Sequence, residues 1–316
     1  MKLIVQIPAY NESSSILEVI RSIPKKIHGI SKIEILVIDD GSTDNTAEAS
    51  KKAGAHYVIR NNKNRGLAYA FQRGLNIALA LGADIIVNTD ADNQYNQSEI
   101  PKLIAPILKG RADIVSGNRK VESLNHMVSA KKYGNILGSK VVKLCAGYPI
   151  KDASSGFRAY SKEAALRLLV LSKHTYTHET LIQAGHKNLR VAEVPVEFKK
   201  RPETNKHSKL ISSVPNHVKK SLITIVRSTL MYNSFKFFSI LGLILAFLGL
   251  FPMVRWLALS LIRGYFGQHT QSLLLGLILL MFGGFSILVA FLADVISINR
   301  RHLEEILYHV KLQNLR

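Results

Sequence analysis

The first 120 residues alternate between short apolar runs and longer segments in which apolar residues recur every three or four positions. The apolar runs have the length and β-branched content of buried strands: 2–7, 33–38, 57–60, 83–87 and 112–116. The segments between them have the spacing of helices that bury one face, beginning with Ile16, Ile20 and Ile23. Strands that alternate with helices at this spacing form a mainly parallel sheet with helices on both faces. The pattern therefore predicts an α/β fold.

The next ninety residues are less regular. They predict helices over 131–145, 163–170 and 180–184, a polar turn over 152–158 and a strand over 190–198. Pro195 interrupts that strand, and we expect it at a sheet edge because proline cannot donate a ladder hydrogen bond. From Val214 to Leu230, apolar residues share one helical face and basic residues lie elsewhere. This pattern is typical of a helix in a membrane interface.

Two later stretches are apolar apart from one serine each: 237–254 and 273–293. Each is long enough to span a bilayer as a helix. Lys and Arg precede the first stretch, Arg300 and Arg301 follow the second, and the loop between them has only two basic residues. Because basic residues favour the cytoplasmic side, we expect a multi-pass plasma-membrane protein with both termini and the first domain in the cytoplasm.

These patterns divide the chain into four parts. We expect a cytosolic catalytic domain, an amphipathic interfacial region, a two-helix transmembrane hairpin and a cytosolic C-terminal tail: 1–210, 211–233, 234–294 and 295–316. Cys145 is the only cysteine, which excludes an internal disulfide and is consistent with a cytosolic domain.

The net charge of +20 indicates a polyanionic partner. The basic residues concentrate beside the apolar stretches, and Glu203 is the last acid before Asp294. A charged lipid surface or a phosphorylated substrate fits this distribution. A nucleic acid does not, because no groove of interleaved basic and aromatic residues is evident.

Acidic residues follow three of the predicted strands. Asp90 and Asp92 come directly after the fourth strand, and because residues i and i+2 of an extended chain point to the same side, both carboxylates can face one point. Hard oxygen ligands of this kind suit Mg²⁺ or Mn²⁺. In parallel sheets ligands bind beyond the carboxyl ends of the strands, where Glu12 and the Asp39–Asp40 pair are also expected. No Gly-x-Gly-x-x-Gly follows the first strand, and no Walker loop is present.

The sequence contains five short motifs: Pro8-Ala9-Tyr10-Asn11-Glu12, Asp39-Asp40-Gly41-Ser42, Asp90-Ala91-Asp92, Gly117-Asn118-Arg119 and Ser155-Gly156-Phe157-Arg158. They occur in the order found in family 2 glycosyltransferases of the GT-A fold, which is Rossmann-like. Over about residues 1–210 the chain most resembles the polyprenyl-phosphate branch of that family. This branch includes dolichyl-phosphate mannose synthases and bacterial undecaprenyl-phosphate glucosyl and aminoarabinosyl transferases.

The resemblance implies roles for individual residues. The donor nucleotide sugar would be bound at Pro8, Tyr10, Glu12, Asp39, Asp40 and Arg65. The divalent metal would be held by Asp90, Asp92 and Gln94, and Asp92 would also be a catalytic residue. Arg119, Lys131 and Arg158 would receive the lipid phosphate. Arg201, Ser208 and Lys209 match the basic acceptor loop near the membrane.

The chain departs from the family pattern near the acceptor. Asn96-Gln97-Ser98-Glu99 replaces the usual Pro-Pro-Glu run, and Lys131 and Asn135 stand where an Arg and a Ser are usual. Lysine supplies charge but not the two-pronged hydrogen bonding of arginine. The acceptor loop also lacks its usual glycine.

The resemblance implies an inverting transfer of a sugar from a nucleotide-diphosphate sugar to a polyisoprenyl phosphate. UDP-hexose is favoured as the donor, with GDP-mannose as the alternative. The acceptor phosphate is largely dianionic at neutral pH because its second pKa is near ~6, so no general base is required. The product is a lipid-linked sugar for a cell-envelope glycan, and homo-oligomers are compatible with the sequence.

Two other functions remain open. Processive polysaccharide synthases of the same family carry a Gln-x-x-Arg-Trp motif after the catalytic domain, but here Arg255-Trp256 follows Phe-Pro-Met-Val at the end of the first apolar stretch. A catalytically inactive membrane scaffold would be expected to have lost the metal-binding acids, which are all present. An assay with labelled nucleotide sugars, lipid phosphate and Mn²⁺ separates these functions.

Overall fold

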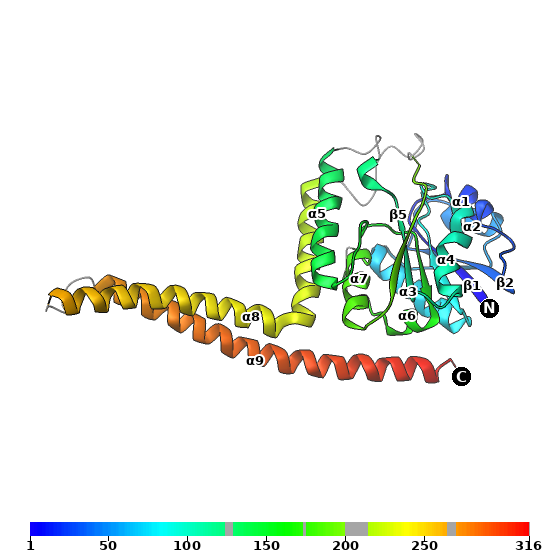
Figure 1. The fold of residues 1–316 in the computed structure, drawn as a ribbon. Helices are drawn as coiled ribbons and strands as arrows, with labels where there is room; N and C mark the ends of the chain where they lie inside the picture. Colours follow the sequence, from blue (N-terminus) through cyan, green and yellow to red (C-terminus); the bar gives the residue numbers. More distant parts are fainter. Residues whose placement is uncertain (124–128, 173–174, 200–213, 264–269, 316) are drawn as a thin grey trace. The chain divides into compact units, whose positions relative to one another are not determined.

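The computed structural model describes residues 1–123, 129–172, 175–199, 214–263 and 270–315 (Figure 1). The chain divides into two compact units. The first comprises Met1–Ser228 with Tyr308–Arg316, and the second comprises Thr229–Leu307. The first unit carries the five motifs shared with family 2 glycosyltransferases.

In the described part of the chain, seven strands form one sheet in the order β3-β2-β1-β4-β6-β5-β7. The strands are β1 (Lys2–Ala9), β2 (Lys32–Asp39), β3 (Tyr57–Arg60), β4 (Ile85–Asn88), β5 (Ile114–Asn118), β6 (Arg158–Ser161) and β7 (Val191–Pro195). All pairs are parallel except those made by β6, which is antiparallel to both β4 and β5. The predicted α/β fold with a mainly parallel sheet is confirmed.

Helices cover both faces of the sheet (Figure 1). In β1, Leu3, Val5 and Ile7 point into one hydrophobic cluster and Ile4 into the other, because successive strand residues alternate between faces. The first cluster is closed by α1 (Ile16–Ser22), α2 (Thr46–Lys52) and α4 (Ile100–Leu108), and the second by α3 (Leu67–Ala80), α6 (Lys162–Arg167) and α7 (Thr177–His186). A further helix, α5 (Ser129–Ala146), contacts α7.

Strand β6 was not predicted from the sequence. Its four residues, Arg158–Ser161, lie between β4 and β5 with both faces covered, so they show no alternation that would identify a strand. The polar turn expected over 152–158 ends where β6 begins. Pro195, by contrast, lies in β7 at the sheet edge, as predicted. The first helix, α1, begins at Ile16, because Glu12–Ser15 form a turn before it.

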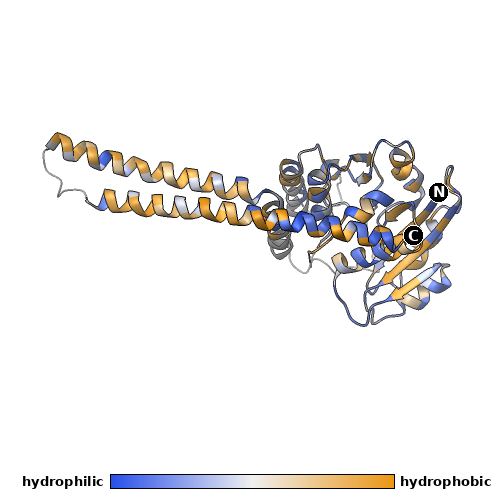
Figure 2. Cartoon of the chain, turned by 90° about the horizontal axis from the view of Figure 1, so that it is seen from below, coloured by the Kyte–Doolittle hydropathy of each residue, from blue (hydrophilic) through white to orange (hydrophobic). Residues whose placement is uncertain are grey.

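Unit two consists of long apolar helices, coloured orange for much of their length in Figure 2. Helix α8 (Val214–Arg263) has non-helical backbone angles at Asn233, so its apolar part is a separate helical segment. Leu230–Ile262 and Thr270–Gln313, the second being α9, are long and apolar enough to cross a membrane. These helices indicate membrane association.

Small residues let the two apolar helices approach closely. A Cβ on Gly283 would lie 2.8 Å from the Gly242 carbonyl oxygen, and one on Gly249 would lie 2.8 Å from the Gly276 carbonyl oxygen. The Ser286 hydroxyl donates to the Phe238 carbonyl at 2.9 Å. Small residues and interhelical hydrogen bonds are the usual basis of helix packing in lipid.

The last turns of α9 belong to the first unit. The Tyr308 hydroxyl donates to Glu163 at 3.1 Å, and the Arg167 guanidinium lies 4.5 Å from the Tyr308 ring centroid. Leu312 and Leu315 pack against the core on the α3, α6 and α7 side. The segment predicted as a tail beginning at 295 is therefore helical to Gln313, and its end packs within the first unit. The expected domain boundaries stay predictions.

Candidate active site

The predicted acids gather at the carboxyl ends of three neighbouring strands. Strand β1 lies between β2 and β4, with Ala9 opposite Asp39 and Gln6 opposite Asn88. The loops that leave these ends carry Glu12, the Asp39–Asp40 pair and the Asp90–Asp92 motif. The parallel register therefore brings residues separated by up to eighty positions to one edge of the sheet, where α/β proteins bind ligands.

The Asp40 carboxylate organises the loop that precedes α3. It is buried and accepts hydrogen bonds from Asn61 Nδ2 at 2.6 Å, from the Arg65 backbone N–H at 3.0 Å and from the Gly66 N–H at 2.7 Å. Gly66 has φ of 93°, which suits glycine. Asp40 thus shapes the wall of the predicted nucleotide pocket and satisfies N–H groups at the start of α3.

Asp39 has an acceptor oxygen to spare. Its Oδ1 accepts the Ser42 backbone N–H at 2.9 Å. Its Oδ2 is buried without a hydrogen-bond partner among the described residues, 3.5 Å from Arg60 Nε. A buried polar atom without a partner is costly unless a ligand satisfies it. Asp39 is therefore suited to accept an N–H or O–H group from a bound nucleotide.

The loops after β1 and β2 are tied together. Asn11 has φ of 52°, a conformation that asparagine tolerates, and its Oδ1 accepts the Thr43 backbone N–H at 2.7 Å. The Glu12 backbone N–H donates to Thr46 Oγ1 at 2.9 Å, and its buried carboxylate accepts Ser15 Oγ at 2.9 Å. Pro8 lies in the buried C-terminal end of β1, which runs to Ala9, and the half-buried Tyr10 begins this loop. Both therefore flank the expected donor pocket.

The predicted metal ligands lie in one tight turn after β4. The Gln94 backbone N–H donates to Asp92 Oδ1 at 3.3 Å across Asn93, whose φ is 59°. Gln94 Nε2 donates to the Lys199 carbonyl at 3.2 Å, which leaves the amide oxygen for a ligand. The Lys199 N–H in turn donates to the Gln94 carbonyl at 2.7 Å. The motif is therefore fixed to the segment that leads towards the predicted acceptor loop.

The oxygen donors at this turn fit a hard divalent cation. The described residues contain no cluster of three or more His, Cys, Asp or Glu side chains able to hold a metal. A cation here would use the carboxylates of Asp90 and Asp92 and the Gln94 amide oxygen, with diphosphate and water oxygens completing its coordination. Such incomplete protein coordination is typical of Mg²⁺ bound with a phosphorylated substrate.

Asp90 lies against the backbone of Gly156. A Cβ at position 156 would be 2.8 Å from both Asp90 carboxylate oxygens, so no larger residue fits without a shift. The Gly156 N–H donates to the Tyr95 hydroxyl at 3.0 Å. Burial raises the pKa of Tyr95 to about 12, which keeps this hydroxyl protonated. The Ser155–Arg158 motif thus lies against Asp90, one of the predicted metal ligands.

Arg119 is held in a buried ion pair. Its Nε and Nη2 donate to the Asp152 carboxylate at 2.7 and 2.8 Å, and Nη2 also donates to Ser154 Oγ at 2.7 Å. The Ser154 hydroxyl lies 3.1 Å from Asn135 Oδ1, on α5. Nη1 makes no hydrogen bond to the residues that the structure describes. The predicted phosphate ligand is therefore pre-oriented by Asp152, with one nitrogen available for an acceptor.

Charge in this pair is strongly stabilised. Burial alone would lower the pKa of Arg119, but the adjacent Asp152 carboxylate outweighs burial and raises it. Burial would likewise raise the pKa of Asp152, and the Arg119 charge instead holds it below its ordinary value. Both groups remain charged at neutral pH.

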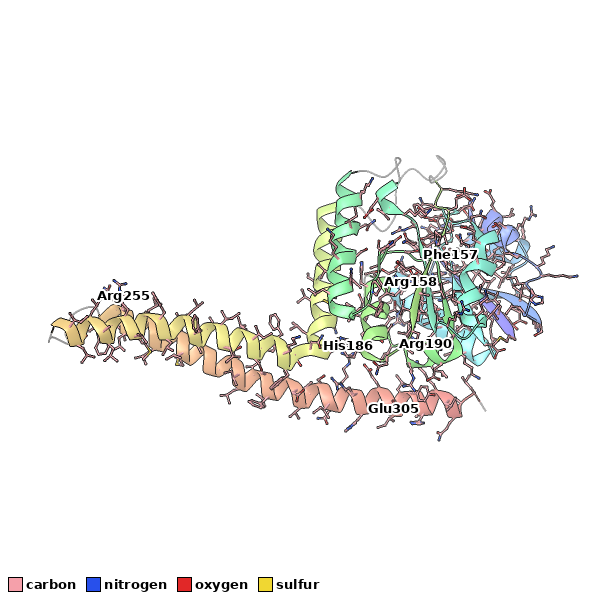
Figure 3. All side chains as sticks on the ribbon, viewed as in Figure 1. Phe157, Arg158, His186, Arg190, Arg255 and Glu305 are labelled. Atoms are coloured by element: carbon pink, nitrogen blue, oxygen red, sulfur yellow. The ribbon has the colours of Figure 1, made fainter. Side chains whose placement is uncertain are left out.

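Arg158 is completely buried at the start of β6 and is labelled beside Phe157 in Figure 3. Its Nη1 donates to the Thr177 carbonyl at 2.7 Å and its Nη2 to the Ala153 carbonyl at 2.8 Å. These bonds tie the turn before β6 to α7. The geometry favours a bracing role for Arg158, and contact with the lipid phosphate stays a prediction.

The other predicted residues are placed differently. The exposed Arg65 guanidinium stacks on the Tyr69 ring, 3.7 Å from its centroid, and donates to the Tyr69 hydroxyl at 2.7 Å. Lys131 lies in the first turn of α5. Arg201, Ser208 and Lys209 lie outside the described residues.

Two residues of the site escaped the sequence analysis. Tyr176 and Asn88 both contact the Gly156 carbonyl, although neither belongs to a charged or metal-binding pattern. Asn88 lies two residues before Asp90, and this closeness to the predicted metal ligands could have indicated it from the sequence. Tyr176 lies eighty-eight positions from Asn88, and no local pattern connects the two.

Comparison with known proteins agrees with this geometry. Residues 4–169 match the profile of a family described as Glycosyl transferase family 2. A dolichol-phosphate mannosyltransferase of Pyrococcus furiosus is 34% identical over 228 residues, covering 69% of this chain and 63% of that protein. A UDP-N-acetylglucosamine–dolichyl-phosphate N-acetylglucosaminyltransferase of Methanococcus voltae is 34% identical over 212 residues, covering 60% and 83%.

Among solved structures, the fold is similar to that of glucosyl-3-phosphoglycerate synthase from Mycobacterium tuberculosis in complex with Mn²⁺, uridine diphosphate and phosphoglyceric acid. The TM-score is 0.53 at 21% identity, over 72% of this chain and 78% of that one. At this identity the likeness supports the GT-A fold alone. With the matched family profile and the strand-end acids in place, the chain belongs to glycosyl transferase family 2 and is a glycosyltransferase.

Proposed function

We propose that this enzyme transfers a sugar from a nucleotide-diphosphate sugar to a polyisoprenyl phosphate at the cytoplasmic face of the membrane. The observation that carries the donor half is the convergence of the Asp39, Asp90 and Asp92 carboxylates on one edge of the sheet. The acceptor half is supported by relatives named for dolichyl phosphate and by the two apolar helices.

Donor binding uses groups that the fold presents in advance. The Oδ2 of Asp39, which makes an ion pair with Arg60 but no hydrogen bond to the described residues, would accept a hydrogen bond from the nucleotide. Asp40 keeps the loop over 61–66 in place, and Glu12 keeps the loop after β1 in place. A divalent cation between Asp90, Asp92 and the donor diphosphate would neutralise the charge that develops on the leaving group. We expect UDP-hexose as the donor, with GDP-mannose as the alternative.

The acceptor side needs position rather than a base. A phosphate monoester carries most of its second charge at neutral pH, since its second pKa is near ~6. One of its oxygens attacks the anomeric carbon while the bond to the diphosphate breaks, and this single displacement inverts the anomeric centre. Arg119, pre-oriented by Asp152, is our first candidate for holding the acceptor phosphate. Lys131, Arg158 and the basic residues at 201 and 209 are further candidates.

Purified full-length protein with labelled nucleotide sugars, a polyprenyl phosphate and Mn²⁺ tests this function. We expect label to enter the lipid phase as one sugar per lipid. A long polymer would indicate a processive synthase, and no turnover with any donor, despite a folded chain, would indicate a scaffold.

A further inference from the structure

The backbone N–H and carbonyl of one residue, Gly156, are both hydrogen-bonded by buried side chains. Its carbonyl oxygen accepts hydrogen bonds from Asn88 Nδ2 at 2.8 Å and from the Tyr176 hydroxyl at 3.2 Å. Its N–H donates to the Tyr95 hydroxyl. Asn88 and Tyr95 lie at the end of β4 and in the turn that follows it, and Tyr176 lies just before α7, so all three are remote in sequence from Gly156 and its backbone is fixed by the tertiary fold rather than by local turn geometry.

These donors are themselves immobilised. Asn88 Nδ2 also donates to the Tyr176 hydroxyl at 2.7 Å, and Asn88 Oδ1 accepts Gln6 Nε2 at 3.0 Å from the neighbouring strand β1. The Tyr176 ring stacks on Phe71 of α3, with centroids 3.8 Å apart and planes within 5°. All four side chains are buried. The chain of contacts therefore runs from α3 and the sheet to a single backbone group.

Asp90 and Tyr176 meet at the α-carbon of Gly156. A Cβ there would lie 2.8 Å from both Asp90 oxygens and 3.0 Å from the Tyr176 hydroxyl. The Gly156 backbone is thus the surface on which the Asp90 carboxylate rests, and its position decides where the carboxylate can point. Groups that orient a metal ligand in this way commonly change metal affinity by ~10–100-fold when they are removed.

We propose that Tyr176, acting with Asn88 through the Gly156 backbone, positions the Asp90 carboxylate for binding a divalent cation. Tyr176 is a positioning residue: it touches neither the cation nor the sugar. The proposal rests on the proposed function for the existence of the metal site and adds a residue that no motif in the sequence indicates.

The decisive substitution is Tyr176→Phe, which removes one hydroxyl and keeps the stacking on Phe71. Tyr160→Phe is the control, because Tyr160 is another fully buried tyrosine beside Phe71, at 5.7 Å between centroids, and its hydroxyl makes no hydrogen bond to the described residues. Free Mn²⁺ is measured by electron paramagnetic resonance in titrations of each full-length variant, with UDP or GDP present, whichever wild type binds.

We expect Tyr176→Phe to weaken Mn²⁺ binding about tenfold, and Tyr160→Phe to leave it unchanged. Without metal, Tyr176→Phe should unfold at a lower temperature than Tyr160→Phe, because it removes two buried hydrogen bonds whereas the Tyr160 hydroxyl has no hydrogen-bond partner among the described residues, but both chains should fold. Nucleoside diphosphate binding without metal should match wild type in both. Equal Mn²⁺ affinity of Tyr176→Phe and wild type, or equal weakening in the two variants, would overturn the proposal. So would a Tyr176→Phe chain that does not fold, since Tyr176 would then be a residue of the core.

A second substitution reaches the same carboxylate by steric means. Gly156→Ala places a methyl group where the Asp90 oxygens lie and should weaken Mn²⁺ binding by more than Tyr176→Phe does. Wild-type Mn²⁺ affinity in Gly156→Ala would show that Asp90 is not positioned by this backbone. Failure of wild type itself to bind Mn²⁺ with either nucleotide would instead contradict the proposed function, so the two failures are distinguishable.

Discussion

At the scale of single residues, the site contains two kinds of acid. Asp40 is saturated by three hydrogen bonds from the loop over 61–66, whereas Asp39 keeps one oxygen without a hydrogen-bond partner among the described residues. Adjacent residues of the same type thus differ in their contacts, because Asp40 binds the loop over 61–66 whereas Asp39 contacts Ser42 and Arg60. Sequence alone does not separate them, since both belong to one motif.

Asp92→Asn tests the metal-binding role of the turn after β4. The change keeps side-chain size and removes one charge, so the chain should fold normally and sugar transfer should drop about a hundredfold or more. EDTA should have the same effect on wild type, with Mn²⁺ or Mg²⁺ restoring activity. Full turnover in the presence of the chelator would refute a metal-dependent reaction.

Arg119 is expected to serve both the fold and the acceptor. Arg119→Ala leaves the buried Asp152 carboxylate unpaired and should lower the free energy of unfolding by about 3–5 kcal/mol. It should also lower lipid transfer about ten- to a hundredfold while nucleotide-sugar binding is kept. Adding Asp152→Asn should recover stability but not transfer. Recovery of both would mean that Arg119 only braces the Asp152 turn.

The same pair predicts an acid-dependent stability. The pKa of Asp152 in the folded chain lies below its ordinary 3.8, because the Arg119 charge outweighs burial. Its contribution is therefore fully present above the ordinary pKa and is lost as pH falls through the folded value. Urea unfolding of Asp152→Asn should show a smaller loss of stability on acidification than wild type. An identical pH profile in the two proteins would contradict this.

At the scale of elements, strongly patterned segments were predictable and short buried ones were not. The runs at 2–7 and 33–38 are long and β-branched, and they form β1 and β2. Strand β6 has four residues, an arginine first, and is defined only by its neighbours β4 and β5. Likewise the motif acids could be located from the sequence, but the contacts of Tyr176 and Asp152 depend on tertiary packing.

The two apolar helices offer a test with an internal control. Gly283→Leu places a side chain 2.8 Å from the Gly242 carbonyl and 3.0 Å from the Ala246 nitrogen, backbone atoms that cannot move aside cheaply. We expect the free energy of unfolding of this helix pair, measured by thermal unfolding in detergent, to fall by about 1–3 kcal/mol. Gly284→Leu adds the same side chain where nothing lies within 4 Å and should be neutral. Equal effects of the two changes would show that the helices do not pack through Gly283.

At the scale of the whole molecule, the proposed function requires the catalytic unit to face the cytoplasm. Single cysteines are introduced near Gly267, His207 or Gln313 in a Cys145→Ser background, and intact cells are treated with an impermeant thiol reagent. Only the cysteine near Gly267 should label, because positive charge flanks the apolar helices on the other side. Labelling near His207 from outside would separate the catalytic unit from its cytosolic donor.

The proposed reaction is the metal-dependent transfer of one sugar to a lipid phosphate. Its most direct test is the mass of the lipid product after reaction of the full-length protein with a panel of nucleotide sugars, polyprenyl phosphate and Mn²⁺. We expect one donor to add a single sugar mass to the lipid, with the product absent in EDTA and nearly absent for Asp92→Asn. Undiminished product from Asp92→Asn or in EDTA, or no lipid-linked sugar from any donor with folded wild-type protein, would contradict it.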